Sequence, residues 1–175
     1  MHTNHPEPAD NADRSDTAEA VRENEIVIAP EQSPEAWLSF IGLINTPWLE
    51  RSTCPRQGDH TGPICELVLD QQWVPALDGL AEYEFIEVLY WLHHSRRDLV
   101  TQSPRADGRT FGTFALRSPV RPNPIGTSIV KLERIDGNRL YVRGLDCLNG
   151  TPLLDIKPDR SLFTPKAAPK TPRPD

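Results

Sequence analysis

Short apolar runs rich in β-branched and aromatic residues constrain the fold of this chain more than any other feature. Runs of this length and composition are typical of β-strands. They cover residues 38–45, 64–69, 84–94, 111–116, 127–135, 139–147 and 152–156. A small chain with this many strands would expose sheet edges unless its sheet closed on itself. The sequence therefore predicts a mainly all-β fold, a small closed or nearly closed β-barrel with a few short helices.

Turn-forming residues between the runs indicate how some of them connect. Residues 136–138 (Asp-Gly-Asn) separate two neighbouring runs, and a short connection that contains glycine favours a β-hairpin. Ser33 followed by Pro34 could begin a short helix that packs Trp37 against the core. A second helical turn is predicted at 76–83.

The two ends of the chain differ in composition from its middle. Residues 1–32 contain eight acids and two bases with almost no large apolar side chains, which predicts a disordered acidic leader. Residues 159–175 are rich in proline and basic residues, which predicts an extended tail. The β-barrel domain is therefore expected to span 33–158.

Charge is unevenly distributed along the chain. The formal net charge is −6, yet residues 93–143 contain ten bases and only four acids. Two interpretations stay open, because this segment could form a surface for a polyanion or an ordinary solvated face.

Several motifs are absent from the sequence. No glycine-rich GxGxxG or Walker motif occurs, so a nucleotide-like ligand would bind without a Rossmann turn. No run approaches the roughly 20 apolar residues of a membrane span, and the start lacks a signal-peptide pattern, so we expect a cytoplasmic protein. Cys54, Cys65 and Cys147 form no CxxC pair and are expected to be reduced thiols, without a disulfide or metal.

The segment 117–128, RSPVRPNPIGTS, is the most unusual in the chain. Its prolines restrict φ and predict a stiff, extended ribbon that leads into a strand. A rigid ribbon that presents Arg117 and Arg121 loses little conformational freedom on binding a ligand. Prolines also protect strand edges from aggregation, but that role does not require the two arginines.

Two loops offer further polar groups. Loop 54–62 holds an arginine and a glutamine, which can bind carboxylates, phosphates or nucleobase edges. Loop 144–158 places the turn NGTP between two strands, where backbone amides and the threonine hydroxyl can face a ligand. Asp146 and Asp155 flank this turn, and each could act as a general base or simply stabilise the turn.

His93 and His94 end the longest predicted strand. Neighbouring side chains in a strand face opposite sides, so we expect one imidazole in a pocket, the other at its rim, and no shared metal. Histidine titrates near neutral pH, so His93 is one candidate catalytic residue. Asp155, which could act as a general base, is the other.

Taken in order, FIGLINTPW, PRQ, the strand that ends in HH, RSPVRPNPIG and NGTPLLDIKP make residues 40–158 resemble the TsaA-like family, whose best-understood branch is the TrmO-type tRNA methyltransferases. The resemblance implies a single-sheeted β-barrel that binds S-adenosylmethionine and usually forms a homodimer with the cofactor near the subunit interface. The implied substrate is N6 of N6-threonylcarbamoyladenosine, beside the tRNA anticodon. Asn149 departs from the family pattern, which usually has an aspartate there.

The resemblance also implies roles for individual residues. Cofactor contacts are expected from Pro55, Arg56, Gln57, His93, His94, Arg117, Thr127, Leu148, Asn149, Gly150 and Thr151. Arg96 and Arg121, in the basic segment, are the candidates for contact with anticodon-loop RNA. Two other functions stay open: methylation of a small molecule, and non-catalytic binding of S-adenosylmethionine or RNA. No metal, membrane or DNA partner is expected.

Overall fold

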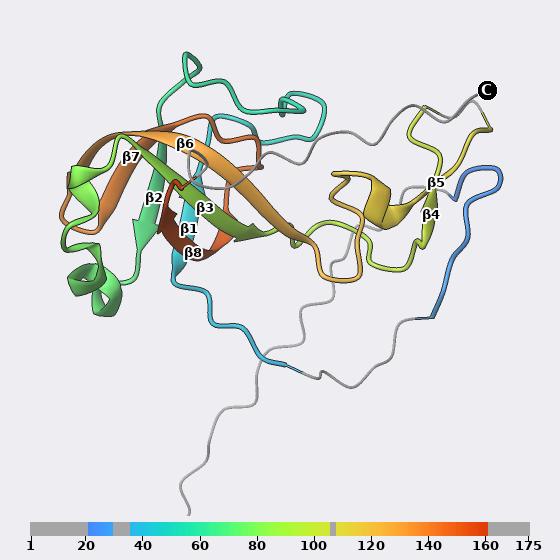
Figure 1. Cartoon of the computed structure of the whole chain (residues 1–175), viewed down its shortest axis with the longest axis horizontal. Coiled ribbons are helices and arrows are strands. Elements are labelled where there is room, and N and C mark those ends of the chain that lie inside the picture. Colours follow the sequence, from blue (N-terminus) through green and yellow to red (C-terminus); the bar gives the residue numbers. More distant parts are fainter. Residues whose placement is uncertain (1–20, 30–35, 106–107, 161–175) are drawn as a thin grey trace, which may run out of the picture.

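Six strands close into a barrel in the computed structural model, which describes residues 21–29, 36–105 and 108–160. In spatial order they are β1 (Gly42–Asn45), β2 (Cys65–Leu69), β7 (Arg139–Arg143), β6 (Ile125–Asp136), β3 (Phe85–Trp91) and β8 (Thr151–Pro158). Each strand runs antiparallel to both neighbours, and β8 closes the barrel by pairing with β1 (Figure 1). The predicted mainly β, single-sheeted barrel is confirmed.

Alternation along the strands fills the barrel interior. Successive strand residues point to opposite faces, so a short strand with an apolar residue at every second position supplies one row of the core. Strands β2 and β3 follow this rule over their whole length. The strand residues with no exposed surface are Ile44, Leu67, Ile86, Val88, Val130, Leu140, Val142 and Leu153.

Strands β6 and β7 form the hairpin predicted from residues 136–138. Gly137 in its turn has φ of 57°, a left-handed conformation that glycine adopts without the steric cost of a side chain. The pairing of β6 with β7 shifts register between Leu132 and Arg134. Such a bulge adds local bend and twist, which a barrel of six short strands needs in order to close.

Some predicted elements differ from the structure. The run 111–116 is not a barrel strand, because only β5 (Phe111–Gly112) is extended, and it pairs with β4 (Thr101–Gln102) alone. The 3-10 helix η3 (Thr113–Ala115) follows at once. The Thr113 hydroxyl donates a 2.7 Å hydrogen bond to the carbonyl of Leu99, which precedes β4, and so fastens this turn to the neighbouring segment.

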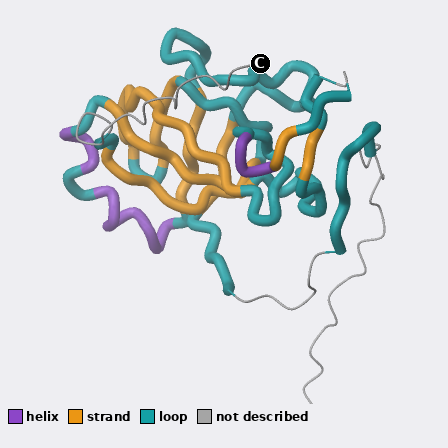
Figure 2. Tube along the Cα trace, turned by 45° about the vertical axis from the view of Figure 1, so that its right-hand side comes forward, coloured by secondary structure: helices purple, strands orange, loops and turns teal. Residues whose placement is uncertain are grey.

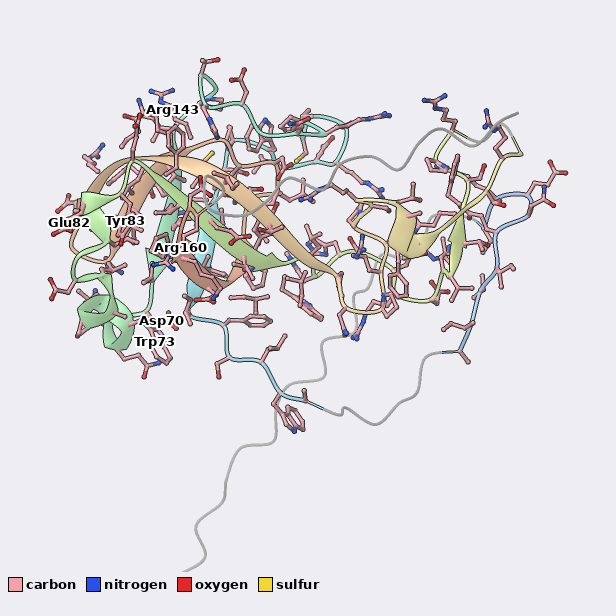
Figure 3. The ribbon with its side chains drawn as sticks, in the orientation of Figure 1. Asp70, Trp73, Glu82, Tyr83, Arg143 and Arg160 are labelled. Atoms are coloured by element: carbon pink, nitrogen blue, oxygen red, sulfur yellow. The ribbon has the colours of Figure 1, made fainter. Side chains whose placement is uncertain are left out.

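The helical turn predicted at 76–83 is two 3-10 helices, η1 (Gln71–Leu77) and η2 (Leu80–Glu82). They lie at the end of the barrel that is remote from the β4–β5 sheet (Figure 1). Trp73 and Tyr83 lie at this same end (Figure 3). The opposite end of the barrel carries the segments that follow β3 and precede β6 (Figure 1). Within the described part of the chain, no helix has the length and apolar character to cross a membrane.

A smaller unit projects from the barrel at the end where β3 finishes and β6 begins (Figures 1 and 2). We call it the β4–β5 lobe, residues 98–105 and 108–116. The buried Gln102 side chain joins its parts, because its amide donates 2.8 Å hydrogen bonds to the Thr113 hydroxyl and to the Val120 carbonyl. The second bond also ties the lobe to the proline-rich ribbon.

Residues 21–29, which belong to the predicted acidic leader, pack along this lobe. Val27 forms a β-bridge with Leu99. The Glu25 carboxylate accepts a 2.9 Å hydrogen bond from the backbone amide of Ser103. This part of the leader is therefore in direct contact with the lobe.

Other predictions for the ends concern residues outside the described ranges. Residues 1–20 and 30–32 of the leader lie there, as do the Ser33 cap and residues 161–175 of the tail. Trp37 is described and is 88% exposed, so its predicted packing on the core is wrong.

Candidate functional site

A small pocket lies at the end of the barrel where β3 finishes and β8 begins. Residues from two segments far apart in the sequence meet there, because antiparallel pairing places the end of β3 beside the start of β8. The lining residues are Leu92, His93, His94, Ser95, Leu148 and Thr151. Four of them are among the residues for which the sequence predicted cofactor contacts.

The two histidines follow β3 rather than end it. The strand finishes at Trp91, and the backbone amide of His93 turns back to donate a 2.8 Å hydrogen bond to the Trp91 carbonyl. The two rings therefore lie together, with centroids 3.8 Å apart, and the expected division into pocket and rim is wrong. In the described ranges, no three histidine, cysteine or carboxylate side chains gather as a metal site would require.

His93 is suited to take up a proton. Partial burial lowers the pKa of His93 below its ordinary value, and the adjacent His94 ring lowers it further. The imidazole of His93 is therefore neutral at pH 7, with a nitrogen lone pair that can accept a proton from a substrate.

The turn before β8 is held by its own hydrogen bonds. Gly150 has φ of 77°, which suits glycine at this position. The Thr151 hydroxyl donates a 2.7 Å hydrogen bond to the Leu148 carbonyl and is almost fully buried. This threonine therefore helps to fix the turn, and it also lines the pocket.

Asn149 connects this turn to the loop after β1. Its side-chain oxygen accepts a 3.1 Å hydrogen bond from the backbone amide of Thr46. The backbone amide of Asn149 donates a 2.8 Å hydrogen bond to the Trp48 carbonyl. An asparagine oxygen makes the first of these bonds without adding a negative charge beside the pocket.

The loop that contains Pro55, Arg56 and Gln57 does not line the pocket but lies against the segment that leads to it. A β-carbon added to Gly58 would lie 2.5 Å from the carbonyl carbon of Gly144, so only glycine permits this approach. The side chains of Arg56 and Gln57 are exposed.

A second contact fastens the same loop. The Cys54 thiol donates a 3.3 Å hydrogen bond to the Asp146 carbonyl. Burial raises the pKa of this thiol, and the Asp146 carboxylate raises it further, so Cys54 stays protonated and able to donate. The loop is therefore anchored two residues before Leu148, which lines the pocket.

A polar cluster that sequence reasoning missed lies beneath this loop. One oxygen of the Asp146 carboxylate accepts hydrogen bonds from the Tyr90 hydroxyl, at 2.7 Å, and from the Ser128 hydroxyl, at 2.8 Å. Burial and the Asp146 charge raise the pKa of Tyr90 far above its ordinary value, so this phenol stays protonated. Of the two roles left open for Asp146, its contacts favour that of an internal hydrogen-bond acceptor.

Gly126 is the sequence signal that could have pointed to the cluster. It lies opposite Tyr90 in the β3–β6 pairing, and a β-carbon there would lie 2.7 Å from ring carbon Cδ2 of that tyrosine. A glycine within a strand often marks such a close approach.

The structure separates the two arginines of the ribbon. Arg117 is exposed. Arg121 turns back onto its own loop and donates hydrogen bonds to the carbonyls of Leu116, at 2.9 Å, and Ser118, at 3.1 Å. The ribbon also bends at 121–123, so it is not the plain extended segment predicted. Arg121 thus helps to shape the ribbon.

Three other predicted site residues lie away from the pocket lining. The Arg96 guanidinium donates two hydrogen bonds, each 2.8 Å long, to the carboxylate of Asp98. The Thr127 hydroxyl donates a 2.9 Å hydrogen bond to the carboxylate of Glu87 on the neighbouring strand. Asp155 lies opposite Leu89 within the barrel wall and is paired with Lys157, so the structure does not bring it to His93.

Comparison with known proteins identifies close relatives. Residues 43–163 match the family described as the tRNA-methyltransferase O N-terminal domain. A probable S-adenosyl-L-methionine-binding protein, VirR of Rhizobium radiobacter, is 57% identical over 147 residues, which are 84% of each chain. A tRNA (adenine(37)-N6)-methyltransferase of Mus musculus is 42% identical over 86 residues, which cover 47% of this chain and 20% of that protein.

Solved structures share the fold. The crystal structure of TrmO from Pseudomonas aeruginosa matches with a TM-score of 0.63 and 33% identity. The match covers 77% of this chain and 60% of that one, so this chain spans about three fifths of the length of the solved relative.

Proposed function

Because this chain belongs to the family of the tRNA-methyltransferase O N-terminal domain, we propose that it transfers a methyl group from S-adenosylmethionine to N6 of N6-threonylcarbamoyladenosine in tRNA. The observation on which this proposal depends is the meeting of His93 and His94 with Leu148 and Thr151 in one pocket at the barrel end. The reaction would take place where tRNA is found, in the cytoplasm.

The groups around the pocket fit this cofactor. S-adenosylmethionine supplies the methyl group on a sulfonium and carries an amine and a carboxylate. The neutral imidazole of His93 tolerates a nearby sulfonium, which a protonated imidazole would repel. Arg117, exposed on the ribbon, is the candidate partner for the carboxylate, and Arg56 and Gln57 are candidates for the polar edges of the adenine and ribose.

His93 is the candidate acceptor of the proton that the attacking N6 nitrogen loses. In-line displacement needs alignment of donor and nucleophile and exclusion of water, and it needs no covalent intermediate with the protein. Asp155, the other candidate base, is paired with Lys157 in the barrel wall, so we assign it no proton transfer.

The size of the pocket supports a shared site. Its cavity volume is about 40 Å³, whereas pockets that enclose a ligand are usually about 300 Å³ or larger. One subunit therefore forms only one wall, and we propose that a homodimer supplies the second.

Purified full-length protein, isotopically labelled S-adenosylmethionine and total tRNA from cells that lack the native enzyme test the proposal directly. Label in adenosine N6 of tRNA supports it. Label in small molecules alone would replace it with small-molecule methylation. Tight cofactor binding with no transfer would indicate a non-catalytic binding module.

Arg117→Ala is expected to weaken cofactor binding about tenfold or more, because a hydrogen-bonded ionic contact contributes about 1.5–3 kcal/mol. Isothermal titration calorimetry measures this, with Arg134→Ala as the control, since Arg134 lies near the far end of β6. Equal affinities in wild type and Arg117→Ala, both folded, would reject Arg117 as a ligand.

Cofactor affinity is expected to fall as the pH is lowered through the pKa of His93, which lies below the ordinary histidine value of about 6.5. Protonation of His93 places a positive charge beside the sulfonium, and because its pKa is lowered the midpoint of the fall should lie below about pH 6.5. Titration calorimetry at several pH values checks this, and His93→Gln should remove most of the fall. A fall of the same size in His93→Gln would contradict the placement of the sulfonium.

A further inference from the structure

The β4–β5 lobe contains a larger pocket than the one at the barrel end. Its cavity volume is about 390 Å³, against about 40 Å³. Its lining residues are Pro104, Arg105, Arg109, Phe111 and Leu116. None of them was assigned a function from the sequence.

The composition of this pocket suits a nucleotide. The two arginine side chains are exposed, and guanidinium groups bind phosphate oxygens through paired hydrogen bonds. Phe111, which lines the same pocket, is 45% exposed, and Phe114, three residues later, is 83% exposed. Aromatic side chains on a solvent-facing surface are the usual platform on which unpaired RNA bases stack.

We propose that this pocket binds one nucleotide of single-stranded RNA, with a phosphate at Arg105 and Arg109 and a base on Phe111. This inference rests on the proposed function, because it takes the RNA to be the anticodon loop of the tRNA substrate.

The attachment of the lobe supports this role. The segment after β3 and the proline-rich ribbon both lead from the barrel end to the lobe (Figure 1). They are joined there by hydrogen bonds from the Leu92 amide to the Pro124 carbonyl, at 2.8 Å, and from the Arg97 guanidinium to the Pro122 carbonyl, at 2.6 Å. Leu92 also lines the pocket that contains the histidines. Its hydrogen bond to Pro124 therefore links that pocket to the ribbon, and the ribbon leads to the lobe.

The lobe replaces the RNA contacts expected from the sequence. Arg96 is held by Asp98, and Arg121 by two backbone carbonyls, so RNA binding by either would require an existing interaction to break. Arg105 and Arg109 both line the larger pocket, beside Phe111.

The double variant Arg105→Ala/Arg109→Ala is expected to bind RNA about tenfold or more weakly. Its plot of log affinity against log salt should be flatter by about 1.4, because each lost phosphate contact on single-stranded RNA removes about 0.7 from the slope. Fluorescence anisotropy of the full chain with a labelled RNA hairpin of the anticodon loop, between about 50 and 200 mM salt, measures both quantities.

Phe111→Leu gives an independent readout. It keeps an apolar side chain in the pocket but removes the aromatic face, so affinity should fall about fivefold or more with the salt slope unchanged. Arg134→Ala, at the far end of β6, is the matched control for loss of an arginine and should affect neither quantity.

The outcomes distinguish this inference from the proposed function. Wild-type slope and affinity in both lobe variants, with tRNA methylation intact in wild type, would overturn the lobe site and leave the methyltransferase standing. Lobe-dependent RNA binding without any methyl transfer would overturn the proposed reaction alone. Equal effects of the lobe variants on binding of polyglutamate would overturn RNA as the ligand, because they would show a general anion site.

Discussion

Gly58→Ala is expected to reduce cofactor affinity more than tenfold while the barrel stays folded. The added β-carbon would lie 2.5 Å from the carbonyl carbon of Gly144, and the Gly144 backbone cannot yield easily because it continues directly from β7. The loop that contains Arg56 and Gln57 must therefore move away from the barrel. Overpacking of this kind costs about 1–3 kcal/mol, which is less than the stability of most domains.

Titration calorimetry with S-adenosylmethionine and urea unfolding together test this expectation. Gly112→Ala is the matched control, because a β-carbon there meets no atom of the described structure within 4 Å. Wild-type affinity in Gly58→Ala would show that the loop takes no part in binding. Unfolding of the variant at low urea would instead show that the loop contributes to the barrel itself.

Asp146→Ala is expected to lower the free energy of unfolding by about 3 kcal/mol or more. Two hydroxyl groups, on Tyr90 and Ser128, lose the same acceptor, and a hydrogen bond to a charged group contributes about 1.5–3 kcal/mol. Asp146→Asn should cost less, because the amide oxygen can still accept. Urea unfolding monitored by circular dichroism measures these differences.

A double-mutant cycle distinguishes the loss of the hydrogen bonds within the cluster from a nonspecific loss of stability. Tyr90→Phe removes one donor of the three-residue cluster, so its effect combined with Asp146→Ala should be smaller than the sum of the single effects. Strict additivity, or a change below about 0.5 kcal/mol in Asp146→Ala, would contradict the cluster as a source of stability. Because the Asp146 carbonyl anchors the Cys54 thiol and Asp146 lies two residues before the lining residue Leu148, the variant should also bind the cofactor less tightly.

Local patterns were sufficient for the barrel and for part of the site. Short apolar runs rich in β-branched and aromatic residues predict strands, and the glycine of residues 136–138 predicts a hairpin, because both signals depend only on neighbouring residues. The histidines and the NGTP turn could likewise be recognised as candidates from their own segments. That they share a pocket is set by the pairing of β3 with β8.

Tertiary structure alone decided which polar groups are available. The sequence predicts that Arg117 contacts the cofactor and Arg121 contacts RNA. In the structure the carbonyls of Leu116 and Ser118 hold Arg121, whereas Arg117 is exposed. Tyr90 and Asp146 meet only because β3, β6 and the segment after β7 converge at one barrel end. A hydrogen bond depends on where distant backbone segments finish, and the spacing of residues within a single segment does not contain that information.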